Sequence, residues 1–162
     1  MIRQLDAVAD RDAVAGLMAQ SQDYWLLWKG RAPDASDVEE YFTSIPPVQA
    51  VSTTLHLGLG DGGTLLGLAE VFFGFPGPQD AYLGLPILVP AARSAGRGAG
   101  YVRQIETLCR TRGATHLYLA VLEANPRGAA FWARMGFAPT GVSRRDTDHA
   151  VPHVVHRLGK AL

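Results

Sequence analysis

Residues 88–100, LVPAARSAGRGAG, constrain the fold of this chain more than any other stretch. An apolar segment runs through a proline into three alternating glycines, and apolar side chains then recur at helical spacing as far as Arg112. The sequence therefore predicts a strand, a glycine-rich turn and a helix in that order. Glycines let the backbone approach a ligand closely, and the first N–H groups of a helix have no partner within it. We predict that this turn binds a phosphate or pyrophosphate group.

Two common phosphate motifs fit the turn poorly. A P-loop requires Gly-Lys-Ser/Thr, which does not follow these glycines. The dinucleotide motif G-x-G-x-x-G matches Gly96 and Gly98, and Glu123 ends the next predicted strand, but its third glycine falls at Tyr101. The preceding strands also form hairpins, whereas that motif needs a parallel series. A tight turn without a ligand remains an alternative.

The remaining sequence predicts an α+β fold in a single domain, residues 1–162, with seven strands and four helices. The predicted strands are residues 2–5, 48–59, 64–73, 81–89, 116–122, 137–142 and 151–158. The four helices are expected to begin at Asp10, Ser36, Gly96 and Asn125. Ser36 and Glu39 have capping-box spacing, and Asp61-Gly62-Gly63 predicts a hairpin turn between the second and third strands.

Composition excludes several classes of protein. The single cysteine, Cys109, rules out an internal disulfide framework and a thiolate zinc cluster, and we expect no metal. Acidic residues near the start and prolines in the longest uncharged run argue against a signal peptide and a membrane span, so we expect a cytoplasmic protein. Residues 1–90 hold four Lys/Arg against eleven Asp/Glu, and residues 91–162 hold the reverse excess. The arginines lie on separate elements and no lysine cluster is present, which disfavours nucleic-acid binding.

A second motif, NPRGAAFWARMGF at residues 125–137, follows the turn. Together with Arg93-x-x-Gly96-x-Gly98 it resembles the GNAT superfamily of acetyl-CoA-dependent N-acetyltransferases. The order of elements agrees over nearly the whole chain, and the motifs are specific over about residues 83–141. The resemblance implies a mixed, mostly antiparallel sheet that splays open after the fourth strand. It also implies that acetyl-CoA is the cosubstrate, with its pantetheine arm in the splay.

The resemblance implies a set of cofactor-binding residues around the splay. Carried onto this sequence they are Leu88, Val89, Arg93, Ser94, Ala95, Gly96, Arg97, Gly98, Ala99, Gly100, Asn125, Ala129, Trp132 and Arg134. Leu88 and Val89 would contact pantetheine through main-chain atoms, and the amide near Leu88 would be the oxyanion donor. Residues 93–100 would hold the pyrophosphate, and Arg134 a ribose phosphate. For Asn125, a plain helix cap is the alternative.

The sequence departs from the family at its general acid. Seven residues after the motif asparagine the family commonly has a tyrosine, and this chain has Trp132, whose indole cannot deliver a proton at neutral pH. A thiol of pKa about 8.5 leaves tolerably as thiolate, so we expect Trp132 to pack on the cofactor arm while solvent protonates the thiolate. Tyr101 is a weaker candidate acid. A non-catalytic acetyl-CoA sensor or partner module is the alternative function that this departure supports.

Glu70 is the only acid within the three central strands, which makes it the candidate general base. An outward-facing charge on a wet strand face is the alternative. His56 and His116 are less favoured as bases, because a lone histidine on a strand is usually structural.

The acceptor site is expected between the first and second strands and at the terminal hairpin. Tyr24, Trp25 and Trp28 lie there among several acids, a combination that suits an amine. A small amine, an aminoglycoside, an amino acid and a protein N-terminus are not separated by this pattern. These aromatic residues could equally be core. Family members often dimerise, so a homodimer stays open.

Overall fold

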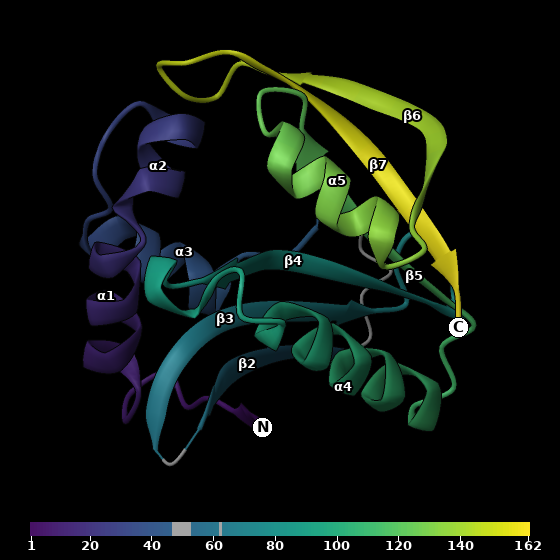
Figure 1. Cartoon of the computed structure of the whole chain (residues 1–162), viewed down its shortest axis with the longest axis horizontal. Coiled ribbons are helices and arrows are strands. Elements are labelled where there is room, and N and C mark those ends of the chain that lie inside the picture. The colour runs from purple at the N-terminus through teal and green to yellow at the C-terminus, as the bar shows by residue number, and fades with distance from the viewer. Residues whose placement is uncertain (47–52, 62) are drawn as a thin grey trace.

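The computed structural model describes residues 1–46, 53–61 and 63–162. Its strands form one seven-stranded sheet in the order β1-β2-β3-β4-β5-β7-β6. All neighbouring pairs are antiparallel except β4 and β5, which are parallel (Figure 1). The strands are β1 (Ile2–Gln4), β2 (Thr53–Asp61), β3 (Thr64–Phe73), β4 (Asp80–Leu88), β5 (His116–Leu122), β6 (Ala138–Asp146) and β7 (His153–Ala161). The predicted α+β sheet of seven strands is confirmed.

The described part of the chain forms five α-helices where the sequence analysis expected four. They are α1 (Arg11–Gln20), α2 (Gln22–Lys29), α3 (Ala35–Thr43), α4 (Arg97–Thr111) and α5 (Pro126–Arg134), with a short 3-10 turn at Pro90–Ala92. The additional helix is α2, which contains the aromatic stretch and is separated from α1 at Ser21. Gly30, in the left-handed conformation, ends it.

The predicted cap of α3 is wrong by two residues. Asp34 is the N-cap: its carboxylate accepts from the Ser36 amide, while the Asp37 carboxylate accepts from the Asp34 amide. The helix therefore begins one residue before Ser36, because two carboxylates complete the reciprocal box that Ser36 and Glu39 were expected to form. At α1, Asp10 occupies the N-cap position but its side chain bonds Arg3 and the Asp6 amide instead.

Helices cover both faces of the sheet (Figure 1). On one face α4 and α5 pack on residues such as Val71, Leu83 and Leu119. On the other face α1, α2 and α3 pack on Leu68 and Ile87. Alternate residues of β3 thus contribute to two separate cores, which explains why this strand is buried along most of its length.

The predicted hairpin between the second and third strands is described only in part. Of the predicted strand 48–59, residues 48–52 lie outside the described residues, as does Gly62 of the predicted turn. The antiparallel pairing of Asp61 with Thr64 confirms the hairpin between β2 and β3. No helix among the described residues is both long enough and apolar enough to cross a membrane.

Candidate active site

The sheet opens between β4 and β5. These strands pair only through Asp80–Leu83 and His116–Leu119, although β4 continues to Leu88 and β5 to Leu122. The register between β3 and β4 shifts between Leu68 and Glu70, and Leu85 has a φ of 42°. Such a bulge increases local twist and bends β4 away from its neighbour. The splay after the fourth strand is therefore present, and it leaves the second half of β4 with a free edge.

Backbone amides at the end of β4 face this free edge. The Val89 amide donates to the Leu66 carbonyl at 2.9 Å, so Val89 and Leu66 form a hydrogen-bonded pair between the chain at the end of β4 and β3. In an antiparallel ladder such pairs alternate with non-bonded ones. The neighbouring Leu88, which lies opposite Gly67, consequently directs its N–H and C=O away from β3. This is the orientation that the predicted oxyanion donor requires.

The glycine-rich turn exposes unpaired amides at the start of α4. Ser94 and Gly96 both have positive φ angles, of 66° and 72°, and Gly96 is the N-cap. The first hydrogen bond into the helix runs from the Gly100 amide to the Gly96 carbonyl. The amides of residues 97–99 therefore have no acceptor within their own helix, as was predicted for this turn. Three outward amides and the helix dipole together favour a bound anion.

Arg93 differs from the other residues of the turn, because its donors are already used within the chain. Its amide donates to the Pro90 carbonyl at 3.1 Å and its Nε donates to the Leu88 carbonyl at 2.9 Å. Its two terminal nitrogens bond the carboxylate of Asp23 on α2. In this arrangement Arg93 links the turn to α2, and the free donors of the turn begin after it.

On the opposite side of the splay, the predicted cofactor-binding residues of α5 differ in how far their side chains are exposed to solvent. The Asn125 side chain accepts from the Gly128 amide at 3.0 Å, so the predicted helix cap is confirmed. Ala129 is half-buried and Arg134 is exposed. Trp132 is only 6% exposed and its ring packs against Phe131 and Phe137 in the core. The cofactor-binding roles of these α5 residues stay predictions.

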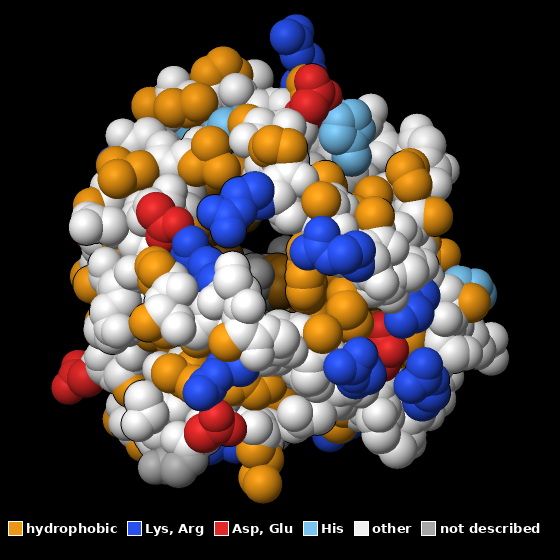
Figure 2. All heavy atoms as spheres, viewed as in Figure 1, with side chains coloured by type: hydrophobic (Ala, Val, Ile, Leu, Met, Phe, Trp, Pro, Cys, Tyr) orange, Lys and Arg blue, Asp and Glu red, His pale blue; other side chains and the backbone are white. Residues whose placement is uncertain are grey.

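Positive side chains surround the opening. Figure 2 shows a hollow near the centre of this face, between α5 and β4 as Figure 1 orients them, with several Lys and Arg side chains around its rim. Positive side chains outnumber negative ones around this hollow, and such an excess attracts ligands of the opposite sign. The rim thus suits a phosphate-bearing ligand.

A cavity of about 250 Å³ lies within the splay. Its walls come from α2, α3 and strands β3 to β7, including residues 82–86 of β4. The three predicted acceptor-site residues, Tyr24, Trp25 and Trp28, all line it. Trp25 is also fully buried in the core beneath α1–α3, so for this residue the structural alternative holds as well.

Glu70 lines the same cavity and is 6% exposed. The alternative of an outward-facing charge on a wet strand face is thereby excluded. The Ser44 hydroxyl donates to its Oε1 at 3.3 Å. Burial raises the pKa of this carboxyl to about 8, and the like charge of Glu40 adds to the effect. A carboxyl of this kind takes up a proton readily near neutral pH, which is what a general base must do.

The two histidines and Tyr101 lie in different surroundings. His116 is partly exposed at the beginning of β5, where it contacts Asp80 and Thr115. Tyr101, on α4, is buried in the core, and burial raises the pKa of its hydroxyl. His56 lies beside Glu70 in the β2–β3 pair.

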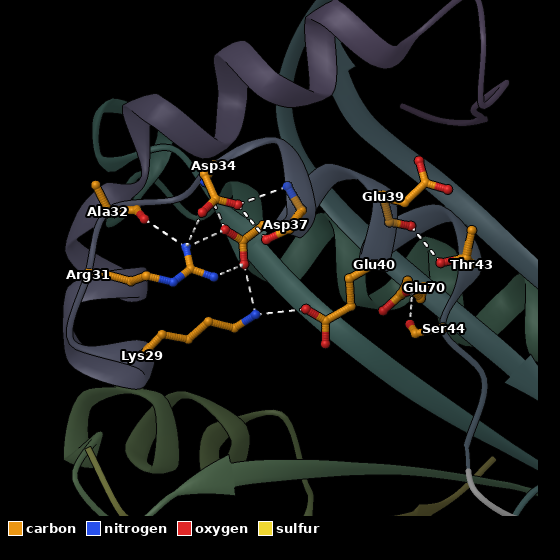
Figure 3. A network of polar contacts seen from close by, with 11 residues as sticks. Lys29, Arg31, Ala32, Asp34, Asp37, Glu39, Glu40, Thr43, Ser44 and Glu70 are labelled. Atoms are coloured by element: carbon orange, nitrogen blue, oxygen red, sulfur yellow. Dashed lines mark hydrogen bonds and ion pairs between the residues drawn. The ribbon is translucent and has the colours of Figure 1, made fainter. Parts of the chain in front are cut away.

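A buried ionic network borders the cavity on the α2–α3 side (Figure 3). The Lys29 ammonium lies 2.7 Å from both Asp37 Oδ1 and Glu40 Oε2, and Arg31 also bonds Asp37. These cations hold the pKa of Asp37 well below its usual range despite its burial. Lys29 is only 4% exposed, and its charge is matched by two carboxylates.

We expect Lys29→Met to lower the free energy of unfolding by about 2–4 kcal/mol, because it leaves Asp37 buried with one cation fewer. Urea denaturation at pH 7 measures this. Arg11→Met is the matched control, since Arg11 makes an exposed ion pair with Glu39 that is expected to contribute below about 1 kcal/mol. Equal losses in the two variants would contradict a structural role for the buried network.

Several cavity residues were not predicted from the sequence. They are Lys29, Ser44, Tyr82, Arg144 and Asp146. Arg144 and Asp146 come from β6, and the loop after β6 returns to α2, where the His153 ring bonds the carbonyls of Leu27 and Trp28. This long-range contact, together with the contact between the rings of Trp28 and His149, brings the terminal hairpin to the cavity. The sequence analysis did expect the terminal hairpin to border the acceptor site. No local sequence pattern, however, singles out Arg144 and Asp146 within that hairpin.

Comparisons with known proteins agree with this architecture. Residues 19–137 match the acetyltransferase (GNAT) family. An acetyltransferase from Thermus thermophilus superposes with a TM-score of 0.76 at 20% identity, covering 100% of this chain and 96% of that one. A ribosomal-protein-alanine N-acetyltransferase from Brucella melitensis gives a TM-score of 0.72 at 16% identity, with 100% and 99% covered. The ribosomal-protein-S18-alanine N-acetyltransferase from Escherichia coli gives 0.68 at 15% identity, with 99% and 92% covered.

No curated protein matches the sequence significantly. The family match nevertheless spans well over half of the chain, and the structural likeness extends over all of it. The splayed sheet, the glycine-rich turn and the match to residues 19–137 agree with one another. The chain belongs to the GNAT family of acetyltransferases.

Proposed function

We propose that this chain is an N-acetyltransferase that moves an acetyl group from acetyl-CoA directly to a primary amine, both substrates being bound together in one domain. This proposal rests mainly on the observation that the splayed part of β4 and the buried side chain of Glu70 line the same cavity. The unpaired amides of the turn lie just beyond the end of the same strand. We also propose a cytoplasmic setting, consistent with the free, buried Cys109.

The residues of the turn fit the diphosphate of acetyl-CoA. The amides of residues 97–99 supply donors, and the positive rim supplies attraction. Acetyl-CoA brings the activated thioester, while the protein must orient it and remove a proton from the amine. The Leu88 amide, directed to the free edge, is the proposed donor to the carbonyl oxygen of the thioester. Glu70 is the proposed acceptor of the amine's proton.

The cavity supports a cationic acceptor. Glu40, Glu70 and Asp146 line it together with Tyr24, Trp28 and Tyr82. Among the cations that line it, Lys29 is bound to two carboxylates and Arg144 lies 4.0 Å from Asp146. Carboxylates and aromatic faces both attract an ammonium group. A small amine, an aminoglycoside, an amino acid and a protein N-terminus remain candidate acceptors.

Ligand-dependent melting followed by thiol release tests this proposal. Acetyl-CoA at 100 times its Kd is expected to stabilise the protein by about 2.7 kcal/mol, or roughly 5–11 °C, and NAD is expected to give no shift. Free thiol should then appear with at least one member of an amine panel. A shift without thiol release from any amine would favour a non-catalytic acetyl-CoA sensor. No shift would contradict both functions.

Trp132→Phe is expected to keep kcat within about threefold of the wild type, because the thiolate leaves without an acid and the indole belongs to the core. The loss of ring volume is expected to cost about 1–2 kcal/mol of stability. Thiol release and thermal melting measure the two effects. Complete loss of turnover with unchanged acetyl-CoA affinity would show that Trp132 takes part in the chemistry.

A further inference from the structure

Glu70 and His56 form a cross-strand pair that the proposed mechanism has not used. They lie directly opposite each other on β3 and β2, and His56 Nε2 is 3.9 Å from Glu70 Oε1. Nε2 is buried and has no hydrogen-bond partner among the described residues. The rings of Tyr41 and Phe42 from α3 hold the imidazole, at centroid distances of 5.2 and 5.4 Å.

The surroundings of His56 fix which nitrogen carries its proton. Burial lowers the pKa of His56, so the ring is neutral near pH 7. A hydrogen bond to the backbone of Tyr41 partly opposes this lowering of the pKa, as a ring N–H that donates to a carbonyl does. Since Nε2 has no partner among the described residues, the donor is Nδ1. The unprotonated Nε2 therefore faces Glu70.

The two oxygens of Glu70 face different groups. Oε1 lies toward Ser44 and His56. Oε2 lies toward β4, where a Cβ built on Gly84 would be 3.0 Å from it. The absence of a side chain at Gly84 thus leaves Oε2 open on the side of the splayed strand. Two other polar neighbours of Glu70 do not bond it. The Tyr41 hydroxyl donates to the carbonyls of Leu57 and Ala69, and Glu40 acts on Glu70 only through its negative charge.

Building on the proposed function, we propose that His56 is a positioning residue that takes the proton from Oε1 of Glu70 once the acceptor ammonium lies beside Oε2, because the positive charge of the ammonium favours the carboxylate that Oε2 then presents to it. The step is balanced. Glu70 and His56 pass from a neutral pair to a carboxylate beside an imidazolium, and Oε2 then accepts one proton from the acceptor ammonium. The amine lone pair forms the C–N bond to the acetyl carbon, the C–S bond breaks, and the thiolate leaves with its electron pair; the nitrogen then gives its second proton to solvent, which protonates the thiolate. The ring must approach by about 1 Å for a hydrogen bond to form, as is common when catalytic contacts tighten on substrate binding.

The pH dependence of kcat/KM tests this role. In His56→Phe the carboxylate loses its proton acceptor, so the acid limb is expected to move upward by about one pH unit and kcat to fall roughly tenfold. KM for the acceptor should change by less than about twofold. His56→Gln, which retains a polar group but takes up no proton, should behave like His56→Phe and provides a second variant if the first does not fold. His116→Phe on β5 is the control and should match the wild type.

A double-mutant comparison separates this inference from the proposed function. His56→Phe combined with Glu70→Gln should be no slower than Glu70→Gln alone, because His56 acts only through Glu70. An acid limb at the wild-type position in both His56 variants would overturn the inference, and so would additive losses in the double variant. Absence of thiol release by the wild type with every amine would instead overturn the proposed function.

Discussion

Replacing Glu70 by glutamine is expected to lower kcat for acetyl transfer by roughly 100- to 1,000-fold, the range typical of losing a general base. The amide keeps the shape of the side chain and a partner for Ser44 but accepts no proton. Because the pKa of Glu70 is about 8, wild-type activity should rise with pH up to that region, and the variant should lack this acid limb. Initial rates of thiol release between about pH 6 and 9.5 measure both effects.

Glu39→Gln is the matched control for this experiment. Glu39 lies on α3 but is exposed and pairs with Arg11 at the surface. Its replacement should leave both kcat and the pH profile unchanged. If Glu70→Gln kept the wild-type rate and acid limb, Glu70 would have no part in proton removal, and acetyl-CoA binding would remain a separate question.

The same substitution should change how stability depends on pH. The pKa of Glu70 in the folded state, about 8, lies above the ordinary value of 4.5, so folding favours the protonated carboxyl. The resulting stability is fully present below about pH 4.5 and is lost as pH rises through about 8. Between about pH 5 and 8.5 this contribution should fall by roughly 2–4 kcal/mol in the wild type and by nothing in Glu70→Gln. Urea denaturation at both pH values measures the difference, and parallel declines would contradict it.

The predictable parts of the fold are those specified by neighbouring residues. The glycine-rich turn, the Asn125 cap and the β2–β3 hairpin each depend on a few adjacent side chains or on backbone angles that glycine adopts easily. The structure confirms all three. The order of strands and helices then followed from hydrophobic periodicity.

Features that depend on competition or on distant segments were missed. At α3, Asp34 and Ser36 are both residue types that commonly occupy an N-cap. Asp34 takes this position because its amide donates to the Asp37 carboxylate. The aromatic stretch of α2 could equally be a loop until it packs beside α1 over the sheet. Asp146 reaches the cavity only because β6 and β7 fold back across the molecule. Single-sequence patterns contain no information on such contacts.

Burial also separated interpretations that the sequence left open. For Glu70, the sequence pattern of β3 is the same whether the side chain faces solvent or a cavity. Only the position of α3 above the face of the sheet that carries Glu70 decides between the two. For Trp132, the structure shows that the ring packs against Phe131 and Phe137 in the core, and its contact with the cofactor stays a prediction.

Gly98→Glu is expected to weaken acetyl-CoA binding at least about 100-fold, which corresponds to about 2.7 kcal/mol. Gly98 is the second residue of α4, and a Cβ there would lie 3.3 Å from Phe131 of α5. A side chain at this position therefore points across the gap between the two helices that border the splay. A glutamate would both occupy that gap and place a negative charge beside the amides proposed to hold the diphosphate.

Isothermal titration with acetyl-CoA measures this loss, and Thr107→Glu provides the control. Thr107 is exposed on the same helix, well beyond its first turn, so it adds the same charge without approaching the unpaired amides. Gly98→Ala, which adds bulk without charge, should give an intermediate loss of about tenfold. If Gly98→Glu bound acetyl-CoA as tightly as Thr107→Glu while remaining folded by circular dichroism, the start of α4 would not be the phosphate site. The placement of both substrates in the splay would then have to be abandoned, because β4 positions the cavity and the turn together.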